Sequence, residues 1–310
     1  MIAAVGLLGY ALLLLTGVAP ALARAAWPER APRLAIAAWL VLCASAIASV
    51  VLGGTALVVP SPGVSGGLAW LLAECERALR AEYAHPGGAV LAGAGGALAV
   101  SVTVRTAWCV VASLTATARA GRRHRRRLRL AGRPDKRLGA VVVDHGEPAA
   151  YCVPGTRHPV VLTTAALRVL DDEQLCAVLA HERAHQAGRH HLLVALAAVP
   201  AAAFAWIPAF RHARDQVVRL AELAADDAAA RRSHRLAVAG ALLTLGAAPA
   251  GALGAGGFTA AARVRRLIEA PDPLSRAASA GGAAAVALLA AAPLALLAIP
   301  LLGACIGCCQ

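Results

Sequence analysis

The sequence predicts a mostly α-helical membrane protein with about four transmembrane helices and an inserted α+β domain that contains a small sheet. Of its 310 residues, 59% are hydrophobic and only 15% are charged, which is too apolar for an ordinary soluble domain of this length. The apolar residues form runs long enough to cross a bilayer as helices. Between the third and the last of these runs lies a polar stretch, about residues 122–270, that carries most of the charges and histidines.

These runs divide the chain into four parts. Residues 1–119 are predicted to hold three spans, at 2–23, 34–60 and 88–111, and residues 271–310 a fourth span at about 280–302 with a short tail. A signal peptide is the alternative for the first run, because Ala21-Leu22-Ala23 resembles a cleavage site, but no basic residues precede it. The third run is rich in glycine and alanine, which let membrane helices approach closely.

The basic residues predict an orientation in the membrane. The net charge is +13, and nine of the thirty basic residues lie between Arg122 and Arg137, inside a juxtamembrane segment at 120–138. Residues 24–33 are also arginine-rich, whereas residues 61–87, a predicted short amphipathic helix, are charge-balanced. By the positive-inside rule the central domain is cytoplasmic and both termini lie outside. No aromatic residues or reading module accompany the charge, so we expect a lipid partner and no direct binding of nucleic acid.

The central domain, residues 139–270, begins with signals for strands. Residues 139–144, 149–153 and 160–163 are predicted to form a small mixed sheet, and an edge strand of such a sheet can pair with an extended peptide. Asp171 is expected to cap the next helix, with Gln174 completing a pattern like a capping box. That helix is predicted to continue to about His191.

The pattern H-E-R-A-H at residues 181–185 lies on this helix. His181 and His185, four residues apart, project from one face and can share one zinc ion, and Glu182 between them can reach a metal-bound water. A second helix, predicted at 211–234, carries Glu222 and Asp226 on one face. Glu222 is the predicted third ligand, and Asp226 is placed to accept the free ring N–H of a ligating histidine.

The apolar stretch 192–210 lies between these two helices. Hydropathy alone would make it a span, but His181 and Glu222 can share an ion only if both of its ends lie on one side of the membrane. It is therefore expected to be a buried hairpin or a re-entrant segment. Arg263 and His234 are candidates for stabilising an oxyanion, although no spacing specifies either residue.

The remaining histidines and cysteines are expected to have ordinary roles. His190 and His191 are more readily explained as helix-end residues than as ligands, because three protein ligands suffice for a catalytic zinc ion. The eight cysteines do not form a disulfide framework. Five are expected to be small, buried or half-buried side chains, and three form a cluster in the tail: Cys43, Cys75, Cys109, Cys152 and Cys176, then Cys305, Cys308 and Cys309.

Residues 170–185, followed by Glu222 and Asp226, resemble the membrane-embedded gluzincin metallopeptidases. These comprise the beta-lactam-sensor type, or penicillin-receptor signal transducers, and the related heat-shock and CAAX prenyl proteases. The resemblance covers about residues 139–267 and implies that His181, His185 and Glu222 bind zinc, with Glu182 as the catalytic base. The order of spans is similar to the sensor type, but the large extracellular penicillin-binding domain of those sensors is not in these 310 residues. Residues 263–267 resemble the arginine-containing segment that closes the site in the heat-shock type.

The expected function is that of a membrane-bound zinc metalloendopeptidase. Its partner would be a cytoplasmic or membrane-adjacent protein, such as a DNA-binding repressor or the protease itself, cleaved in signalling. The alternatives are a quality-control or prenyl-type protease, and a non-catalytic signalling protein that contains zinc. Glu182 speaks against the last of these, because a structural zinc site has no use for a base beside an open coordination position.

Overall fold

A computed structural model describes residues 1–58, 87–153, 160–246 and 260–307. The amphipathic helix predicted at 61–87 falls almost wholly outside these residues. The elements before the sheet are α1 (Ile2–Leu13), a π-helical turn η1 (Leu14–Val18), α2 (Ala19–Arg24), α3 (Trp27–Arg30), α4 (Pro32–Val58) and α6 (Gly88–Ala131). The elements after it are α7 (Thr164–Val169), α8 (Asp172–Ala187), α9 (His190–Ala203), α10 (Pro208–Ala230), α11 (Arg235–Gly246), α12 (Ala260–Glu269) and α13 (Arg276–Gly307).

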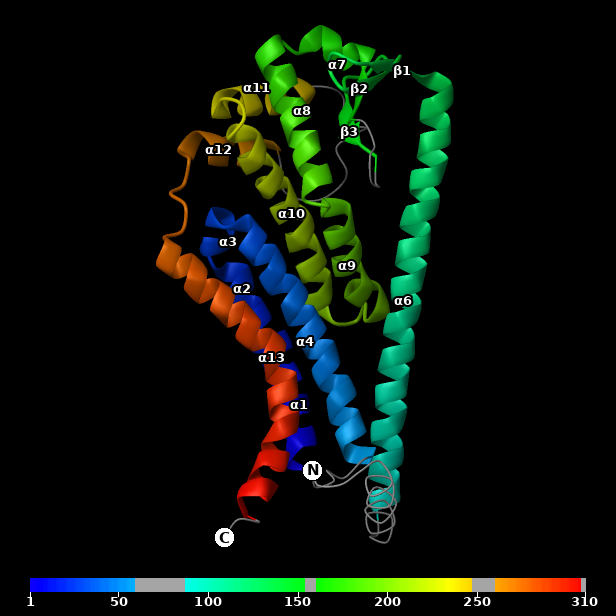
Figure 1. Cartoon of the computed structure of the whole chain (residues 1–310), viewed down its shortest axis with the longest axis vertical. Helices are drawn as coiled ribbons and strands as arrows, with labels where there is room; N and C mark the ends of the chain where they lie inside the picture. The colour runs from blue at the N-terminus through cyan, green and yellow to red at the C-terminus, as the bar shows by residue number, and fades with distance from the viewer. Residues whose placement is uncertain (59–86, 154–159, 247–259, 308–310) are drawn as a thin grey trace.

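Four helical segments of the described chain are long and apolar enough to cross a membrane: residues 2–24, 32–58, 88–128 and 276–298. They correspond to the four predicted spans. In Figure 1, α1 begins and α13 ends at one end of the molecule, whereas the sheet lies at the other end. The free ends of these two helices therefore lie at the same end of the molecule.

The third candidate span is longer than predicted. A single helix, α6, continues from Gly88 to Ala131, and β1 (Gly132–Asp135) follows it directly. Arginine has a high helix propensity, so the basic segment extends the helix without interruption. The sheet thus starts inside the predicted segment 120–138, before the predicted domain boundary at residue 139.

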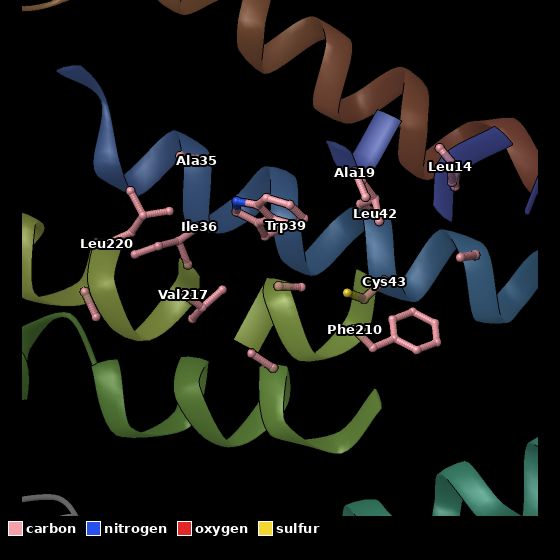
Figure 2. Close-up of a cluster of buried hydrophobic side chains, with 14 of the residues drawn as sticks. Leu14, Ala19, Ala35, Ile36, Trp39, Leu42, Cys43, Phe210, Val217 and Leu220 are labelled. Atoms are coloured by element: carbon pink, nitrogen blue, oxygen red, sulfur yellow. The ribbon is translucent and has the colours of Figure 1, made fainter. Parts of the chain in front are cut away.

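The first two candidate spans share one hydrophobic core with α9 and α10. Figure 2 shows Trp39 and Leu42 of α4 among buried side chains that include Val217 and Leu220 of α10. Phe210, at the start of α10, belongs to the same cluster. Because α10 also carries Glu222, the helix with the predicted third ligand packs directly against a candidate span.

A proline explains one set of polar contacts inside the bundle. Pro293 in α13 has no N–H, so it cannot donate to the carbonyl of Leu289 four residues earlier. The hydroxyl of Ser45 in α4 donates to this carbonyl at 2.7 Å, and that of Tyr10 in α1 at 3.2 Å. These two donors join three candidate spans at the point where α13 loses a backbone hydrogen bond.

The crossing of α4 and α6 depends on two glycines. A Cβ atom on Gly95 would lie 2.7 Å from the Cβ of Leu57 and 2.8 Å from the carbonyl oxygen of Gly54. We expect Gly95→Ala to push the helices apart and lower the free energy of unfolding by about 1–3 kcal/mol. The measurement is thermal unfolding in detergent, with Gly93→Ala as the control, because a Cβ there meets nothing within 4 Å. Equal melting temperatures for the two variants would contradict the close approach.

The sheet is mixed, as predicted, and has four strands. Its order is β1-β2-β4-β3, with β2 at Ala140–Val143, β3 at Ala150–Cys152 and β4 at Val160–Thr163. β2 and β4 are parallel, whereas β1 and β3 pair antiparallel at the two edges. All four residues of β4 are buried. The edge strand β3 lies against α8, which carries the histidine motif.

The turn between β1 and β2 is tied to the motif helix. Gly139 has a φ of 60°, a left-handed conformation that favours glycine. The guanidinium of Arg183 on α8 donates to the carbonyl of Leu138 at 2.7 Å. Because Arg183 is the third residue of the H-E-R-A-H motif, this contact fixes the motif against the sheet.

The cap of α8 is confirmed, but the helix ends earlier than predicted. The Asp171 carboxylate accepts from the backbone N–H of Gln174 at 2.8 Å. The Gln174 side chain instead turns toward α11, where it accepts from Thr244 at 3.4 Å. α8 ends at Ala187. Arg189, in a left-handed conformation with a φ of 48°, changes the direction of the chain before α9 begins.

Residues 190–230 form a helical hairpin in which α9 and α10 pack side by side (Figure 1). Its tip reaches α6, where the Arg105 guanidinium donates to the carbonyl of Ala203 at the end of α9. The guanidinium carbon of Arg105 also lies 5.4 Å from the centre of the Trp206 ring. An arginine of a candidate span thus caps the first helix of the hairpin.

Candidate metal centre

The hairpin brings the motif helix and α10 together at one cluster of ligating side chains. His181, His185 and Glu222 each offer one atom, and these three atoms lie within 4.8 Å of one another. His181 Nε2 lies 3.1 Å from His185 Nε2. The Glu222 carboxylate oxygens are 3.6 Å from His181 Nε2 and 3.4 Å from His185 Nε2.

These separations suit a tetrahedral zinc ion. Ligand atoms about 2.0–2.1 Å from zinc and arranged tetrahedrally are about 3.3–3.4 Å apart. The two histidine nitrogens are 3.1 Å apart, and each lies 3.4–3.6 Å from a different oxygen of Glu222, so these separations are close to that value. Two imidazole nitrogens and one carboxylate are also the donor set of a catalytic zinc site with a fourth position for water.

Asp226 lies behind the first histidine. Its Oδ1 is 3.0 Å from His181 Nδ1, and the residue is fully buried. A proton on Nδ1 that is donated to Asp226 leaves the Nε2 lone pair of His181 directed at the cluster. Asp226 therefore lies where the spacing of residues 222 and 226 places it.

Arg263 on α12 reaches the same carboxylates. Its Nε and Nη2 donate to Asp226 at 2.8 and 2.6 Å, and its Nη1 lies 3.0 Å from a Glu222 oxygen. All three of these guanidinium nitrogens contact Asp226 or Glu222. The geometry therefore supports a role for Arg263 in orienting these two carboxylates more than a role in stabilising an oxyanion. His234, the other candidate, is exposed just before α11, and no described contact links it to the cluster.

Glu182 faces the edge strand of the sheet. The backbone N–H and the thiol of Cys152 in β3 both hydrogen-bond to its carboxylate. Burial raises the pKa of Glu182 to about 6, and the charge of Glu222 acts in the same direction. No motif in the sequence singles out Cys152 for a role at the site. Only its place in the predicted strand 149–153 could have indicated this contact.

A cavity of about 210 Å³ opens beside the cluster. His185 and Glu222 lie at its wall together with Cys152, and the rest is formed by side chains of α9 and α10: His190, His191, Val194, Val218 and Ala221. The valines and the alanine give it an apolar part next to the ligating atoms. The cavity therefore has room for an apolar group next to the ligating atoms.

Zinc binding is expected to release a proton from His181. Burial lowers the pKa of His181, but hydrogen bonds that its ring donates to the Asp226 and Glu222 carboxylates raise this pKa to about 9 in the metal-free protein. The ring is therefore charged at neutral pH and must become neutral to bind a metal ion. Burial lowers the pKa of His185 to about 4, so that ring is already neutral at pH 7 and can bind a metal ion without losing a proton.

The expected result is release of about one proton per zinc ion at pH 7, with apparent affinity that rises with pH until about pH 9. Titration calorimetry in buffers of different ionisation enthalpy measures the released protons. The Asp226→Asn variant is the control, because loss of the carboxylate removes the hydrogen bond that does most to raise the pKa of His181. Binding without proton release at pH 7 would contradict a charged His181.

Comparison with known proteins gives one match. Residues 116–246 match the family model of peptidase family M48. No curated protein and no solved structure matches the chain. The matched segment includes α8, the hairpin and all three residues of the cluster, which supports the class of zinc metallopeptidase. Nothing in the match distinguishes the beta-lactam-sensor type from the other types that the motifs resemble.

Proposed function

From the match of residues 116–246 to peptidase family M48, we propose that the chain is a membrane-bound zinc metalloendopeptidase. One observation carries the proposal. The nitrogens of His181 and His185 and the carboxylate of Glu222 converge at the spacing of zinc ligands, and Glu182 lies on the same helix. A structural zinc site needs four protein ligands, whereas this cluster has three among the described residues.

The residues around the cluster suit peptide hydrolysis. A zinc ion held by His181, His185 and Glu222 would acidify a water molecule and polarise the peptide carbonyl. The Glu182 carboxylate accepts the proton of the attacking water and returns it to the leaving amine. A base with a pKa of about 6 is mostly ionised at pH 7, yet basic enough to take a proton. Arg263 keeps Glu222 oriented during these steps.

The substrate is proposed to be an extended peptide that pairs with β3. This strand is an edge of the sheet, and the side of β3 that faces away from β4 can pair with another strand, except at the Cys152 N–H, which bonds to Glu182. Its last residue, Cys152, contacts Glu182, and a peptide paired with β3 would therefore pass the cluster. The cavity between α9 and α10 would then receive an apolar side chain next to the scissile bond.

The proposed setting is the cell membrane, with the cluster on the cytoplasmic side. The four apolar helices support the membrane location, and the arginines at the end of α6 support the orientation. The contact of Arg105 with Ala203 supports a re-entrant hairpin. A reporter that is active only outside the cytoplasm, fused after Phe210, should give no signal. A strong signal would contradict this topology.

Metal removal tests the proposed activity. Purified protein in detergent should cleave an unfolded protein substrate, lose that activity in a zinc chelator and regain it when zinc is added back. The control is a matched sample in which the chelator is saturated with zinc before addition. Unchanged cleavage after removal of all bound metal would contradict a zinc peptidase.

The biological role is proposed to be signalling, through cleavage of a repressor or of the protease itself. The order of spans around the domain, similar to the sensor type, supports this role. A quality-control protease is the alternative. The two roles differ in the number of proteins cleaved in cells, which is one or two for signalling and many for quality control.

A further inference from the structure

His190 is buried directly behind the second histidine of the motif. It is the first residue of α9 and is 5% exposed. Its Nδ1 lies 2.9 Å from Nδ1 of His185. The other ring nitrogen of His185, Nε2, faces His181 and Glu222. His190 therefore contacts the side of the His185 ring that points away from the proposed metal position.

We propose that His190 is a positioning residue that accepts the Nδ1 proton of His185. This proposal rests on the proposed zinc site. A neutral imidazole carries one proton, so a ring that offers the Nε2 lone pair to a metal has its proton on Nδ1. The only described partner within 3 Å of that nitrogen is Nδ1 of His190. His190 must then have its own proton on Nε2.

The two histidine ligands thus have different acceptors. His181 Nδ1 lies 3.0 Å from the Asp226 carboxylate, whereas His185 Nδ1 faces a neutral imidazole. A carboxylate at position 190 would add a fourth acidic group beside Glu182, Glu222 and Asp226. The positive charge of Arg263 offsets the negative charges of two of these groups, Glu222 and Asp226. A neutral acceptor fixes the tautomer of His185 without further raising the pKa of the base Glu182.

The chain before His190 is shaped to admit its ring. A Cβ atom on Gly188 would lie 2.4 Å from Nε2 and 2.6 Å from Cδ2 of His190. The φ of Gly188 is −77°, so the backbone conformation does not require glycine. Glycine is required at this position because a larger residue would occupy the space of the His190 imidazole. Gly188 and His190 therefore act together, and two different substitutions can test one contact.

A role for His190 as a metal ligand agrees less well with the geometry. Its Nδ1 is directed at His185, and among the described residues the converging set is His181, His185 and Glu222. An ordinary role as a helix-end residue does not explain a buried ring held at hydrogen-bond distance from a ligand. The position of His190 instead matches that of Asp226 behind the other histidine.

Zinc affinity tests the proposal without use of activity. Metal-free protein in detergent is titrated with zinc against a competing chelator. His190→Ala and Gly188→Ala should each bind zinc about 10–100-fold more weakly. His190→Asn should bind close to wild type, because the amide oxygen can accept the same proton. The controls are His212→Ala, an exposed histidine of α10, and Gly146→Ala, where a Cβ meets nothing within 4 Å.

The outcomes separate this inference from the proposed function. The melting temperature of each metal-free variant identifies any that has lost its fold. Wild-type affinity in His190→Ala would overturn the positioning role, as would equal losses in His190→Asn and His190→Ala. Wild-type protein that binds no zinc would overturn the proposed function and this inference together. Weak zinc binding by Gly188→Ala and His190→Ala, with recovery in His190→Asn, supports both.

Discussion

Glu182→Gln is expected to abolish peptide hydrolysis while zinc binding stays intact. The amide has nearly the shape of the carboxylate but cannot take a proton from water, and loss of a general base lowers the rate by about 10²–10⁴-fold. Glu182 is not among the three converging ligands, so the affinity for zinc should change little. The measurements are the cleavage rate of an unfolded protein substrate and the zinc content of the purified variant.

The same variant distinguishes the two proposed roles in cells. New protein termini that appear with wild-type protein and are missing with Glu182→Gln identify substrates. One or two defined termini, in a DNA-binding protein or in this chain, would support signalling, whereas many termini in damaged membrane proteins would support quality control. Cleavage that survives Glu182→Gln at the wild-type rate would exclude Glu182 as the base.

Asp226→Ala is expected to cause the largest loss of stability. Asp226 is fully buried and accepts two hydrogen bonds from Arg263, which is 8% exposed. Removing Asp226 leaves two guanidinium nitrogens of Arg263 without their acceptor, and breaking a buried pair in this way costs about 3–5 kcal/mol. Zinc affinity should also fall, by about 10–100-fold, because His181 loses the acceptor of its Nδ1 proton. Chemical unfolding of the metal-free protein in detergent measures the first effect.

The neighbouring Asp227 supplies the control for this variant. It pairs with Arg266 at 2.7 Å, but about a third of its side chain is exposed. Without Asp227, Arg266 keeps its hydrogen bonds to the Glu29 carbonyl, so Asp227→Ala should lose less stability than Asp226→Ala. Equal losses of unfolding free energy in Asp226→Ala and Asp227→Ala would show that the buried pair of Asp226 and Arg263 contributes no more to stability than the partly exposed pair.

The pH dependence of stability follows from the same carboxylate. Burial raises the pKa of Asp226, but hydrogen bonds from Arg263 and His181 outweigh it and lower the pKa from 3.8 to about 2. The group therefore stabilises the metal-free fold above about pH 4 and loses that contribution as the pH falls toward 2. In Asp226→Asn this part of the acid dependence should be missing.

Local sequence determined much of this protein. Four apolar runs predicted the four long helices, because their length and composition suffice to identify them. The cap at Asp171 and three of the strands also follow from short patterns. His181 and His185 lie on one face because an α-helix places residues four apart together. None of these features depends on a distant part of the chain.

Only the tertiary structure decided which separate segments meet. The approach of Cys152 to Glu182, of Arg263 to Asp226 and of Arg105 to Ala203 joins residues that no spacing relates. His190 was expected near the end of the motif helix. Because α8 ends at Ala187, His190 instead begins α9, and its ring lies at hydrogen-bond distance from His185. Periodicity reports which face of an element is apolar, whereas the pairing of faces depends on how the whole chain packs. A contact between a side chain and a distant backbone group therefore has no local signature.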